Sequence, residues 1–377
     1  MKSKPGRVAI LTRTSTNNFG TILQAYALQN YISSLGFEVY VIDDSIPRKE
    51  YVNVSTLEKP NQSVKARIYN CFDHLIEKIQ LIYYLKFKQN TANFKKKHIR
   101  YYKPKSTQEL NSKFDIFVSG SDQIWANAAE PLLFPFFMQD FVSDEKAQIS
   151  YAVSIGESVF PESKKELVNK LVNRFDYLSV RELPSKQMLR QYTDKSISVT
   201  CDPVLLLKNE IWDIIAGKRK VKEKYIFCYF LSENSWYCKK VQELTEFYGF
   251  QAYIVGKKHN NFTATKFKYI ENCSPEDFLN YIKYSSFVLT DSFHATLFSI
   301  IFGSSFNVFE RFKDKTNTQN NRLLYILDRF SIKSLYIKNS EPLNFEKVDY
   351  SAIKDYINSF AEESKQYLYS ALCSYDL

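Results

Sequence analysis

One of the four histidines in this chain lies where a proton-transfer group would be useful. His294 belongs to the polar run 290–296, at the start of a predicted helix that follows the apolar stretch 287–289. An imidazole in a first helical turn can exchange protons near neutral pH, and the backbone N–H groups beside it can hold an anion. The same pattern also fits a capped helix with a structural histidine, so both interpretations stay open.

A second candidate is the loop 13–20, which links the predicted strand 8–12 to the predicted helix 21–35. Its N–H groups at the positive end of the helix could bind an anion, with Asn18 at the cap. Gly20 would let the backbone approach a ligand closely. The alternative is a loop whose Asn and Ser side chains only cap the helix.

A third candidate, 119–125, follows the predicted strand 114–118. Open α/β sheets place ligands at the carboxyl ends of their strands. Asp122 and Gln123 could bond hydroxyl groups, and Trp125 offers an aromatic face for stacking. A local turn with a tryptophan in the core is an equally good interpretation of the spacing.

The elements that position these residues alternate between strand and helix along most of the chain, which predicts the α/β class with parallel sheets. We predict an N-terminal Rossmann-like lobe over 1–210, with a helical insertion at 48–105. A second Rossmann-like lobe should cover 211–345, after a hinge within 206–224, and a helical segment should cover 346–377.

Composition narrows the classes of function. The chain of 377 residues carries 51 basic and 41 acidic residues, a formal net charge of +10 that favours anionic partners. Its six cysteines lack the spacing of a metal site, so we predict no metal. The basic run 95–105 could meet nucleic acid or a membrane surface, but a solvated helix end is the favoured interpretation.

No apolar segment of the signal-peptide kind follows the first residues, so we expect a cytoplasmic protein. The longest apolar stretch, 68–87, is interrupted by charged residues and is not expected to cross a bilayer.

Six short motifs, in this order, resemble those of the polysaccharide pyruvyl transferase family. They are NFGTILQAYAL at 18–28, SGSDQIW at 119–125, YAVSIG at 151–156, SVRE at 179–182, CDPVLL at 201–206 and TDSFH at 290–294. The resemblance covers 8 to about 330, and Ala295 departs from it because glycine is common there. It implies two Rossmann-like lobes arranged as in GT-B glycosyltransferases, with donor and acceptor meeting in a cleft between them.

The resemblance also implies an activity: transfer of pyruvate from phosphoenolpyruvate to a hexose of a capsule or exopolysaccharide precursor, as a ketal. His294 matches the acid/base residue and Arg181 an arginine that binds the donor. The other residues expected on the donor side are Asn18, Gly20, Ser292 and, as candidates for a second arginine, Arg311 and Arg322. Those expected on the acceptor side are Asp122, Gln123 and Trp125. Phosphoenolpyruvate is the donor substrate, and no other cofactor is expected.

The expected partners are phosphoenolpyruvate and a sugar or lipid-linked oligosaccharide, without nucleic acid. Acceptor contacts are expected in 48–105, and the basic surface suggests peripheral association with the inner membrane leaflet. Two alternatives remain open at this stage: a GT-B glycosyltransferase that uses a nucleotide sugar, and a glycan-binding relative without turnover.

Overall fold

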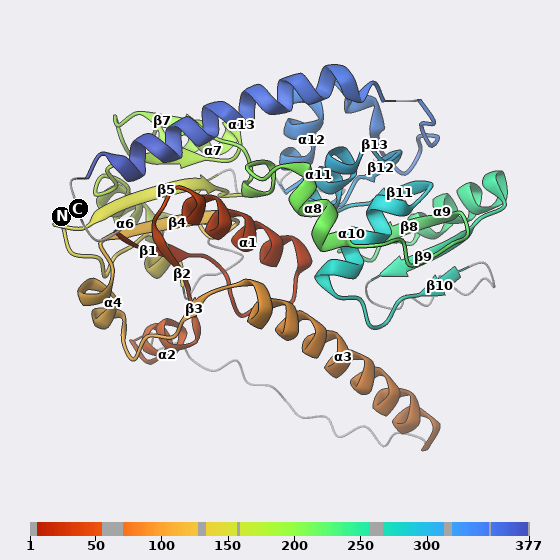
Figure 1. Cartoon of the computed structure of the whole chain (residues 1–377), viewed down its shortest axis with the longest axis horizontal. Coiled ribbons are helices and arrows are strands. Elements are labelled where there is room, and N and C mark those ends of the chain that lie inside the picture. The colour runs from red at the N-terminus through yellow and green to blue at the C-terminus, as the bar shows by residue number, and fades with distance from the viewer. Residues whose placement is uncertain are drawn as a thin grey trace.

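The computed structural model describes residues 6–54, 71–126, 133–156, 159–255, 267–312, 319–346 and 348–375. Its strands form two separate parallel sheets, one in each of two lobes (Figure 1). The predicted α/β class with two Rossmann-like lobes is confirmed.

The first sheet has seven strands in the spatial order β3-β2-β1-β4-β5-β6-β7. They are β1 (Arg7–Leu11), β2 (Glu38–Ile42), β3 (Tyr101–Tyr102), β4 (Ile116–Asp122), β5 (Ala147–Val153), β6 (Leu178–Val180) and β7 (Ile197–Val199). The order reverses between β1 and β4, and ligands of doubly wound sheets bind outside the carboxyl ends of the strands at such a point. The strand β4 continues to Asp122, so four residues expected in a loop belong to the strand.

The helices of this lobe are α1 (Phe19–Ser34), α2 (Ser45–Val54), α3 (Cys71–His98), α4 (Thr107–Lys113), α5 (Phe134–Phe137), α6 (Glu162–Val172) and α7 (Leu183–Leu189). A short 3₁₀ helix, η1 (Pro203–Leu205), and then α8 (Asn209–Ala216) lead to the second lobe. The stretch expected to be a hinge therefore contains a helix.

The second sheet repeats the same plan with six strands in the order β10-β9-β8-β11-β12-β13. They are β8 (Tyr225–Tyr229), β9 (Gln251–Val255), β10 (Phe267–Tyr269), β11 (Phe287–Thr290), β12 (Phe306–Phe309) and β13 (Tyr336–Ile337). Its helices are α9 (Trp236–Tyr248), α10 (Pro275–Tyr284), α11 (Phe293–Phe302), α12 (Gln319–Arg329) and the 3₁₀ helix η2 (Lys333–Leu335). The order reverses between β8 and β11, so each lobe has its own switch point.

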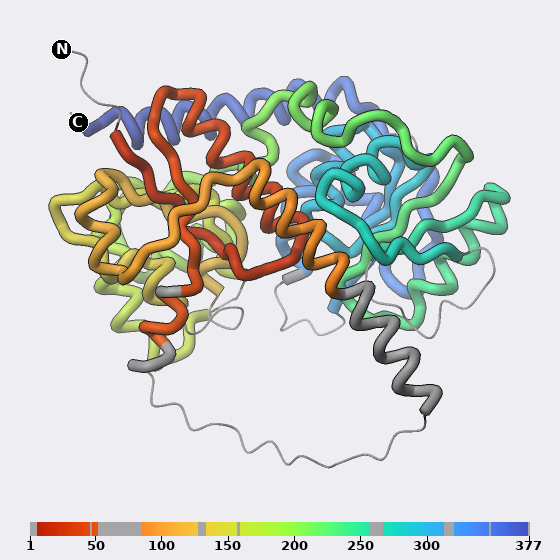
Figure 2. The backbone as a smooth tube through the Cα atoms, turned by 60° about the horizontal axis from the view of Figure 1, so that its bottom comes forward, coloured from red at the N-terminus to blue at the C-terminus, as the bar shows by residue number. Residues whose placement is uncertain are grey.

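The last helix, α13 (Tyr350–Cys373), runs along both lobes and returns to the first (Figures 1 and 2). Its Tyr350 hydroxyl donates to the carbonyl of Ser304 in the second lobe. In the first lobe, the Tyr367 hydroxyl donates to the carbonyl of Ser150 at 2.9 Å. Two Rossmann-like lobes with a C-terminal helix that returns to the first are the GT-B arrangement.

Helix α1 is the centre of the contact between the lobes. Every residue from Phe19 to Gln29 is buried, whereas the sequence predicts one apolar face on the sheet. The reason is that α1 packs on its own sheet and also contacts α10 and α11 of the second lobe. The ring of Phe19 stacks on Phe278 of α10 at 5.0 Å between centroids, so one apolar core crosses the lobe boundary.

Helix α3 is displaced from the predicted helix at 64–87: it begins at Cys71 and continues to His98, within the basic run 95–105. Residues 55–70, part of the expected insertion, lie outside the described residues. Near its C-terminal end α3 reaches the other lobe, where His98 Nε2 lies 3.7 Å from Glu276 Oε1. Within the described ranges, no helix is long and apolar enough to cross a membrane.

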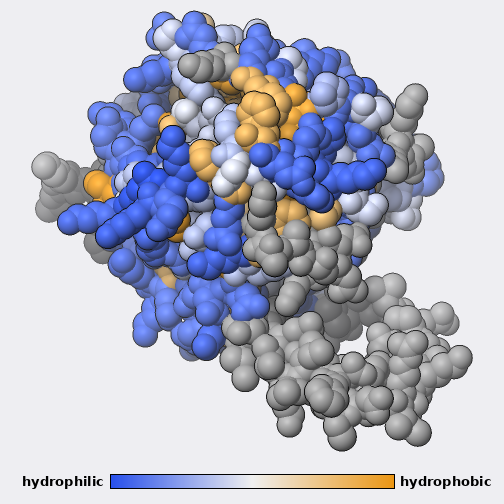
Figure 3. Space-filling view, turned by 90° about the vertical axis from the view of Figure 1, so that its right-hand side faces the viewer, coloured by the Kyte–Doolittle hydropathy of each residue, from blue (hydrophilic) through white to orange (hydrophobic). Residues whose placement is uncertain are grey.

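The outer surface of the second lobe is mostly hydrophilic, with several apolar areas between the polar side chains (Figure 3). Helix α9 carries Phe247, which is exposed and stacks on Phe345 at 4.8 Å between ring centroids.

Candidate functional site

The N-termini of α1 and α11, one from each lobe, meet side by side. Asn18 caps α1 by accepting a hydrogen bond from the Thr21 amide at 3.3 Å. Ser292 caps α11, and its Oγ accepts from the Ala295 amide at 3.4 Å. Because both side chains are used as caps, Asn18 and Ser292 position the helix ends. Two positive helix ends at one place favour negative charge there.

His294, in the first turn of α11, lies against Gly20 in the first turn of α1. A Cβ atom built on Gly20 would lie 2.2 Å from Nδ1 of His294, which is far inside van der Waals contact. Glycine is therefore required at position 20 so that the imidazole can approach the helix. The sequence predicts that a ligand approaches the backbone closely at Gly20; in the structure the group that does so is the His294 side chain of the other lobe.

Arg181 follows β6 and is held by two carboxylates. Its Nη1 lies 2.8 Å from Oδ2 of Asp202, and its Nε lies 3.4 Å from Oε2 of Glu182. Burial alone would lower the pKa of the guanidinium, which is 3% exposed, but the two carboxylates raise it above its usual value. Arg181 is thus a fixed cation at the lobe boundary.

The ring of Phe293 joins Arg181 to a second buried arginine. The Arg181 Cζ lies 4.2 Å from the ring centroid, and the Arg322 Cζ of α12 lies 6.0 Å from it. Arg322 is 7% exposed, and burial and the neighbouring Arg181 lower its pKa to about 10, so it stays charged at neutral pH. No carboxylate among the described residues forms an ion pair with Arg322.

The other arginine candidate, Arg311, lies just after β12 and is half-buried. Its guanidinium lies 5.0 Å from the ring centroid of Phe312, and its backbone N–H donates to Asn320 Oδ1. Of the two candidates, the structure therefore buries Arg322 beside Arg181.

Asp122 ends β4 and faces the same cations. Its Oδ2 accepts a hydrogen bond from the Thr21 hydroxyl at 2.5 Å. Burial alone would raise the pKa of Asp122, but the charges of His294 and Arg181 and the Thr21 bond hold it well below its usual 3.8. The expected acceptor residue is thus a buried anion that balances positive charge.

The two residues that follow Asp122 have different environments. The Gln123 amide packs against Gly156, where a Cβ atom would lie 2.1 Å from its Nε2. Trp125 is 0% exposed, and its Nε1 donates to the carbonyl of Phe137 at 2.9 Å. The expectation that Trp125 stacks on a sugar is wrong, because Phe137 and the edge-on ring of Phe175 enclose its indole in the core.

The loop before α1 is bonded within the protein more completely than the sequence suggests. The amides of Thr14 and Ser15 lie 3.4 and 3.5 Å from Oδ2 of Asp44. Lys95 of α3 donates to the carbonyls of Thr14 and Thr16 at 2.8 and 2.5 Å. The amides of Thr14 and Ser15 face a carboxylate of the protein, so the amides that could still bind an anion are those at the start of α1.

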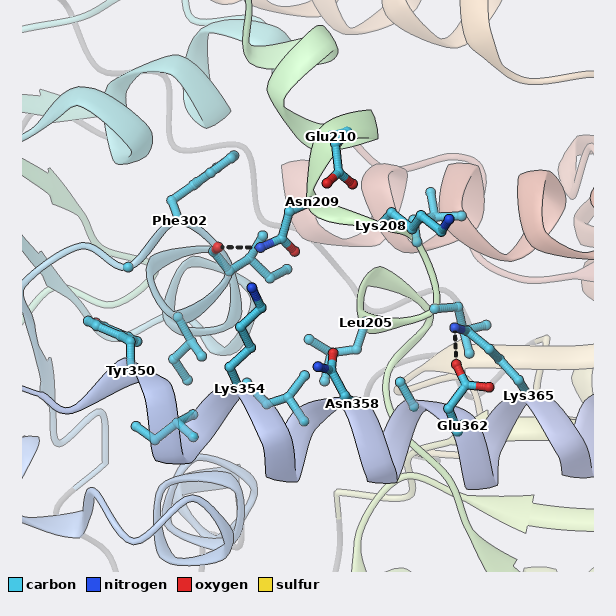
Figure 4. A pocket seen from close by; sticks show the side chains of 18 residues that line it. Leu205, Lys208, Asn209, Glu210, Phe302, Tyr350, Lys354, Asn358, Glu362 and Lys365 are labelled. Carbon is cyan, nitrogen blue, oxygen red and sulfur yellow. Dashed lines mark hydrogen bonds and ion pairs between the residues drawn. The ribbon is translucent and has the colours of Figure 1, made fainter.

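A pocket of about 450 Å³ lies away from these residues (Figure 4), between the crossover 205–210, the end of α11 and α13. The Asn209 amide donates to the carbonyl of Ile301 at 3.1 Å beside it, and Lys365 pairs with Glu362 at 2.5 Å. His294, Arg181 and Arg322 do not line this pocket. No histidine among the described residues lines it.

The residues that the sequence analysis gave no role are Asp202, Glu182 and Phe293. All three lie inside the quoted motifs. Glu182 and Phe293 could have been found because they are adjacent to the candidates Arg181 and His294. Asp202 could have been found because it is the acidic residue of the motif at 201–206. Among the described residues, no group of three or more His, Cys, Asp or Glu side chains could hold a metal ion.

The arrangement can hold an anion and move a proton beside it. Arg181 is already paired with two carboxylates, so the positive charge that faces no ion-pair partner among the described residues comes from Arg322 and the two helix N-termini. Such charge is worth more in a site of low dielectric constant than in water. The imidazole of His294 supplies the proton carrier.

The family model for polysaccharide pyruvyl transferase matches residues 18–311. No curated protein matches the chain.

Similar solved structures include UDP-GlcNAc 2-epimerase from Neisseria meningitidis bound to UDP-GlcNAc, with 12% identity and a TM-score of 0.47, covering 98% of this chain and 100% of that one. UDP-GlcNAc 2-epimerase from Methanocaldococcus jannaschii has 13% identity and a TM-score of 0.46, covering 93% and 91%. MurG from Acinetobacter baumannii has 8% identity and a TM-score of 0.42, covering 96% and 95%. The family match spans both lobes and includes Gly20, Arg181 and His294, and this chain belongs to the polysaccharide pyruvyl transferase family.

Proposed function

We propose that this transferase moves a pyruvyl unit from phosphoenolpyruvate to two hydroxyl groups of a hexose, forming a ketal on a capsule or exopolysaccharide precursor. The observation that carries the proposal is the cluster of Arg181, Arg322 and His294 between the lobes. Phosphoenolpyruvate carries a phosphate and a carboxylate, which suits two fixed guanidinium groups. Its methylene carbon must gain a proton, which suits an imidazole beside them.

The proposed reaction balances without an oxidant or a metal. His294 delivers a proton to the methylene carbon, which becomes a methyl group, and positive charge develops at the adjacent carbon. One sugar hydroxyl attacks that carbon, the bond to the phosphate oxygen breaks, and inorganic phosphate leaves. A second hydroxyl closes the ketal. Of the two hydroxyl protons, one replaces the proton that His294 gave and the other leaves with phosphate.

Each cluster residue has a role in this scheme. Arg181 and Arg322 bind the phosphate and the carboxylate, and the ends of α1 and α11 add backbone donors. Asp122 is the anion that keeps the two arginines and His294 together when the donor is absent. Gln123, half-buried after Asp122, remains the proposed contact to acceptor hydroxyls.

A second part of the proposal concerns location. The end of α3 and the segment after it present exposed cations at Lys96, Lys97, Arg100, Lys103 and Lys105. We propose that they hold this cytoplasmic protein against the anionic inner leaflet, where a lipid-linked acceptor would be. If this contact forms, the protein should bind anionic vesicles, and the binding should weaken as the salt concentration rises. Binding that does not depend on salt, or no binding, would contradict the proposed membrane contact.

Phosphate release tests the proposed reaction. The wild-type protein is incubated with phosphoenolpyruvate and a panel of lipid-linked or nitrophenyl hexosides, beside His294→Ala and Arg181→Ala. The expected result is acceptor-dependent release that both substitutions abolish. His98→Gln and Arg174→Ala, at residues outside the cluster, serve as matched controls and should retain release. If no acceptor of the panel gives phosphate release and the protein binds a nucleotide sugar, a glycosyltransferase is favoured instead.

A further inference from the structure

Asp202 joins the two lobes at the candidate site through a single carboxylate. Its Oδ2 lies 3.3 Å from Nε2 of His294 in the second lobe and 2.8 Å from Nη1 of Arg181 in the first. The contact to His294 has ion-pair distance without the geometry of a hydrogen bond. The other oxygen, Oδ1, accepts from the Val204 amide at 3.2 Å. The side chain of Asp202 is 1% exposed, so both of its oxygens serve protein groups.

The backbone that carries Asp202 is firmly supported. Pro203 follows it and opens η1, for which Asp202 is the cap. The amide of Cys201 donates to Oγ of Ser364 on α13 at 2.8 Å, and the Tyr151 hydroxyl donates to the carbonyl of Cys201 at 3.0 Å. A carboxylate on such a support can fix the orientation of its partners.

We propose that Asp202 is a positioning residue that sets the tautomer of His294, so that Nδ1 is the nitrogen that faces the donor. Oδ2 of Asp202 lies 3.3 Å from Nε2, where it attracts a proton and would repel a lone pair, so the charge of the carboxylate favours the proton on that nitrogen. Nδ1 then lies beside Gly20 at the positive end of α1, where an anionic donor is favoured. This inference rests on the proposed function.

The same carboxylate couples the proton carrier to the donor arginine. Asp202 and Arg181 belong to the first lobe and His294 to the second, so the imidazole has its carboxylate partner only when the lobes are together. The charged groups of the cluster, from every element packed against it, are Asp122 at the end of β4, Arg181 and Glu182 after β6, Asp202 before η1 and Arg322 on α12.

The direct test is the tautomer of the neutral form of His294 in the wild-type protein, observed by ¹⁵N NMR across a pH titration and assigned with His294→Gln. The expected result is that the one proton of the neutral imidazole lies on Nε2, so that Nδ1 is the nitrogen that gains and loses a proton. A neutral imidazole with its proton on Nδ1 would overturn the inference. This reading needs neither substrate nor turnover, so it stays valid if phosphoenolpyruvate is not the donor.

Kinetics of Asp202→Asn supply the second test. Loss of the correct tautomer costs about 10⁴-fold in kcat in the best-known carboxylate–histidine pair, so we expect a loss of about 10²-fold or more here. In a His294→Gln background the same change should lower the residual turnover at least about tenfold less than it does in the wild type, because residues that act as a unit are not additive and only the effect through Arg181 remains. Equal losses in both backgrounds would overturn the positioning role.

The failure modes are distinguishable. Wild-type protein without phosphate release would end the proposed function but leave the NMR result standing. An active wild type with an equally active, folded Asp202→Asn would end this inference alone. Asp115→Asn, at the opposite end of β4 and bonded to the Arg7 amide, is the control for loss of a carboxylate and should keep full turnover.

Discussion

Gly20→Ala should separate catalysis from stability. The new Cβ atom would lie 2.2, 2.3 and 2.6 Å from Nδ1, Cγ and Cβ of His294, whereas comfortable contacts lie near about 3.5 Å. The imidazole must therefore retreat by roughly 1 Å, and a misplacement of that size can cost about 100-fold in rate. Alanine also gains up to about 1 kcal/mol over glycine inside a helix, which offsets part of the steric cost to folding.

We therefore expect kcat for phosphate release to fall about 100-fold while the free energy of unfolding in urea changes by less than about 1 kcal/mol. Gly36→Ala is the matched control. Gly36 has a φ of +97° and an added Cβ would meet nothing within 4 Å. That variant should lose about 1 kcal/mol or more of stability and keep its turnover. Full turnover in Gly20→Ala would refute the contact between the two helix ends.

Three further predictions concern the same cluster and its surroundings. Arg322→Gln should raise the KM for phosphoenolpyruvate about 10- to 100-fold, the value of one or two charge-assisted bonds, and more than Arg311→Gln does; the reverse order would make Arg311 the second donor arginine. Trp125→Phe should cost about 1–3 kcal/mol in urea unfolding through its lost bond and the space left, with an unchanged KM for the acceptor; a raised KM would restore its role in sugar binding. The lowered pKa of Asp122 contributes stability above its usual 3.8 that is lost as pH falls below that value, so acid unfolding should be less steep in Asp122→Asn than in the wild type; equal slopes would contradict its pairing with the cations.

The parts of the fold that the sequence predicts well are those set by local pattern. The alternation of apolar strands and amphipathic helices predicted both Rossmann-like lobes. In the structure the two lobes repeat the same plan of strand order. The motif around His294 also predicted a helix start correctly, since Ser292 is a good cap whatever surrounds it.

What the sequence could not predict depends on contacts between distant segments. Trp125 appeared available to a sugar because nothing nearby in sequence indicated that Phe137 and Phe175 would enclose it. Helix α1 appeared one-sided because its second set of neighbours lies in the other lobe. In both cases tertiary packing, and not local propensity, decides which side chains are buried.

The same limit applies to the site. Asp202 precedes a proline and caps the 3₁₀ helix η1. Its second role, beside Arg181 and His294, requires the two lobes to be assembled. The choice of the second donor arginine likewise depends on burial, which the sequence does not show. Arg322 on α12 is buried, whereas Arg311 after β12 is half-buried.

The most direct test of the central claim is the fate of phosphoenolpyruvate labelled with ¹³C at its second carbon, followed by NMR with an acceptor hexoside. The account predicts that the label appears in the quaternary ketal carbon of the sugar, with one phosphate released for each ketal, and that His294→Ala abolishes both signals. Label that remains in phosphoenolpyruvate while the protein consumes a nucleotide sugar would contradict it.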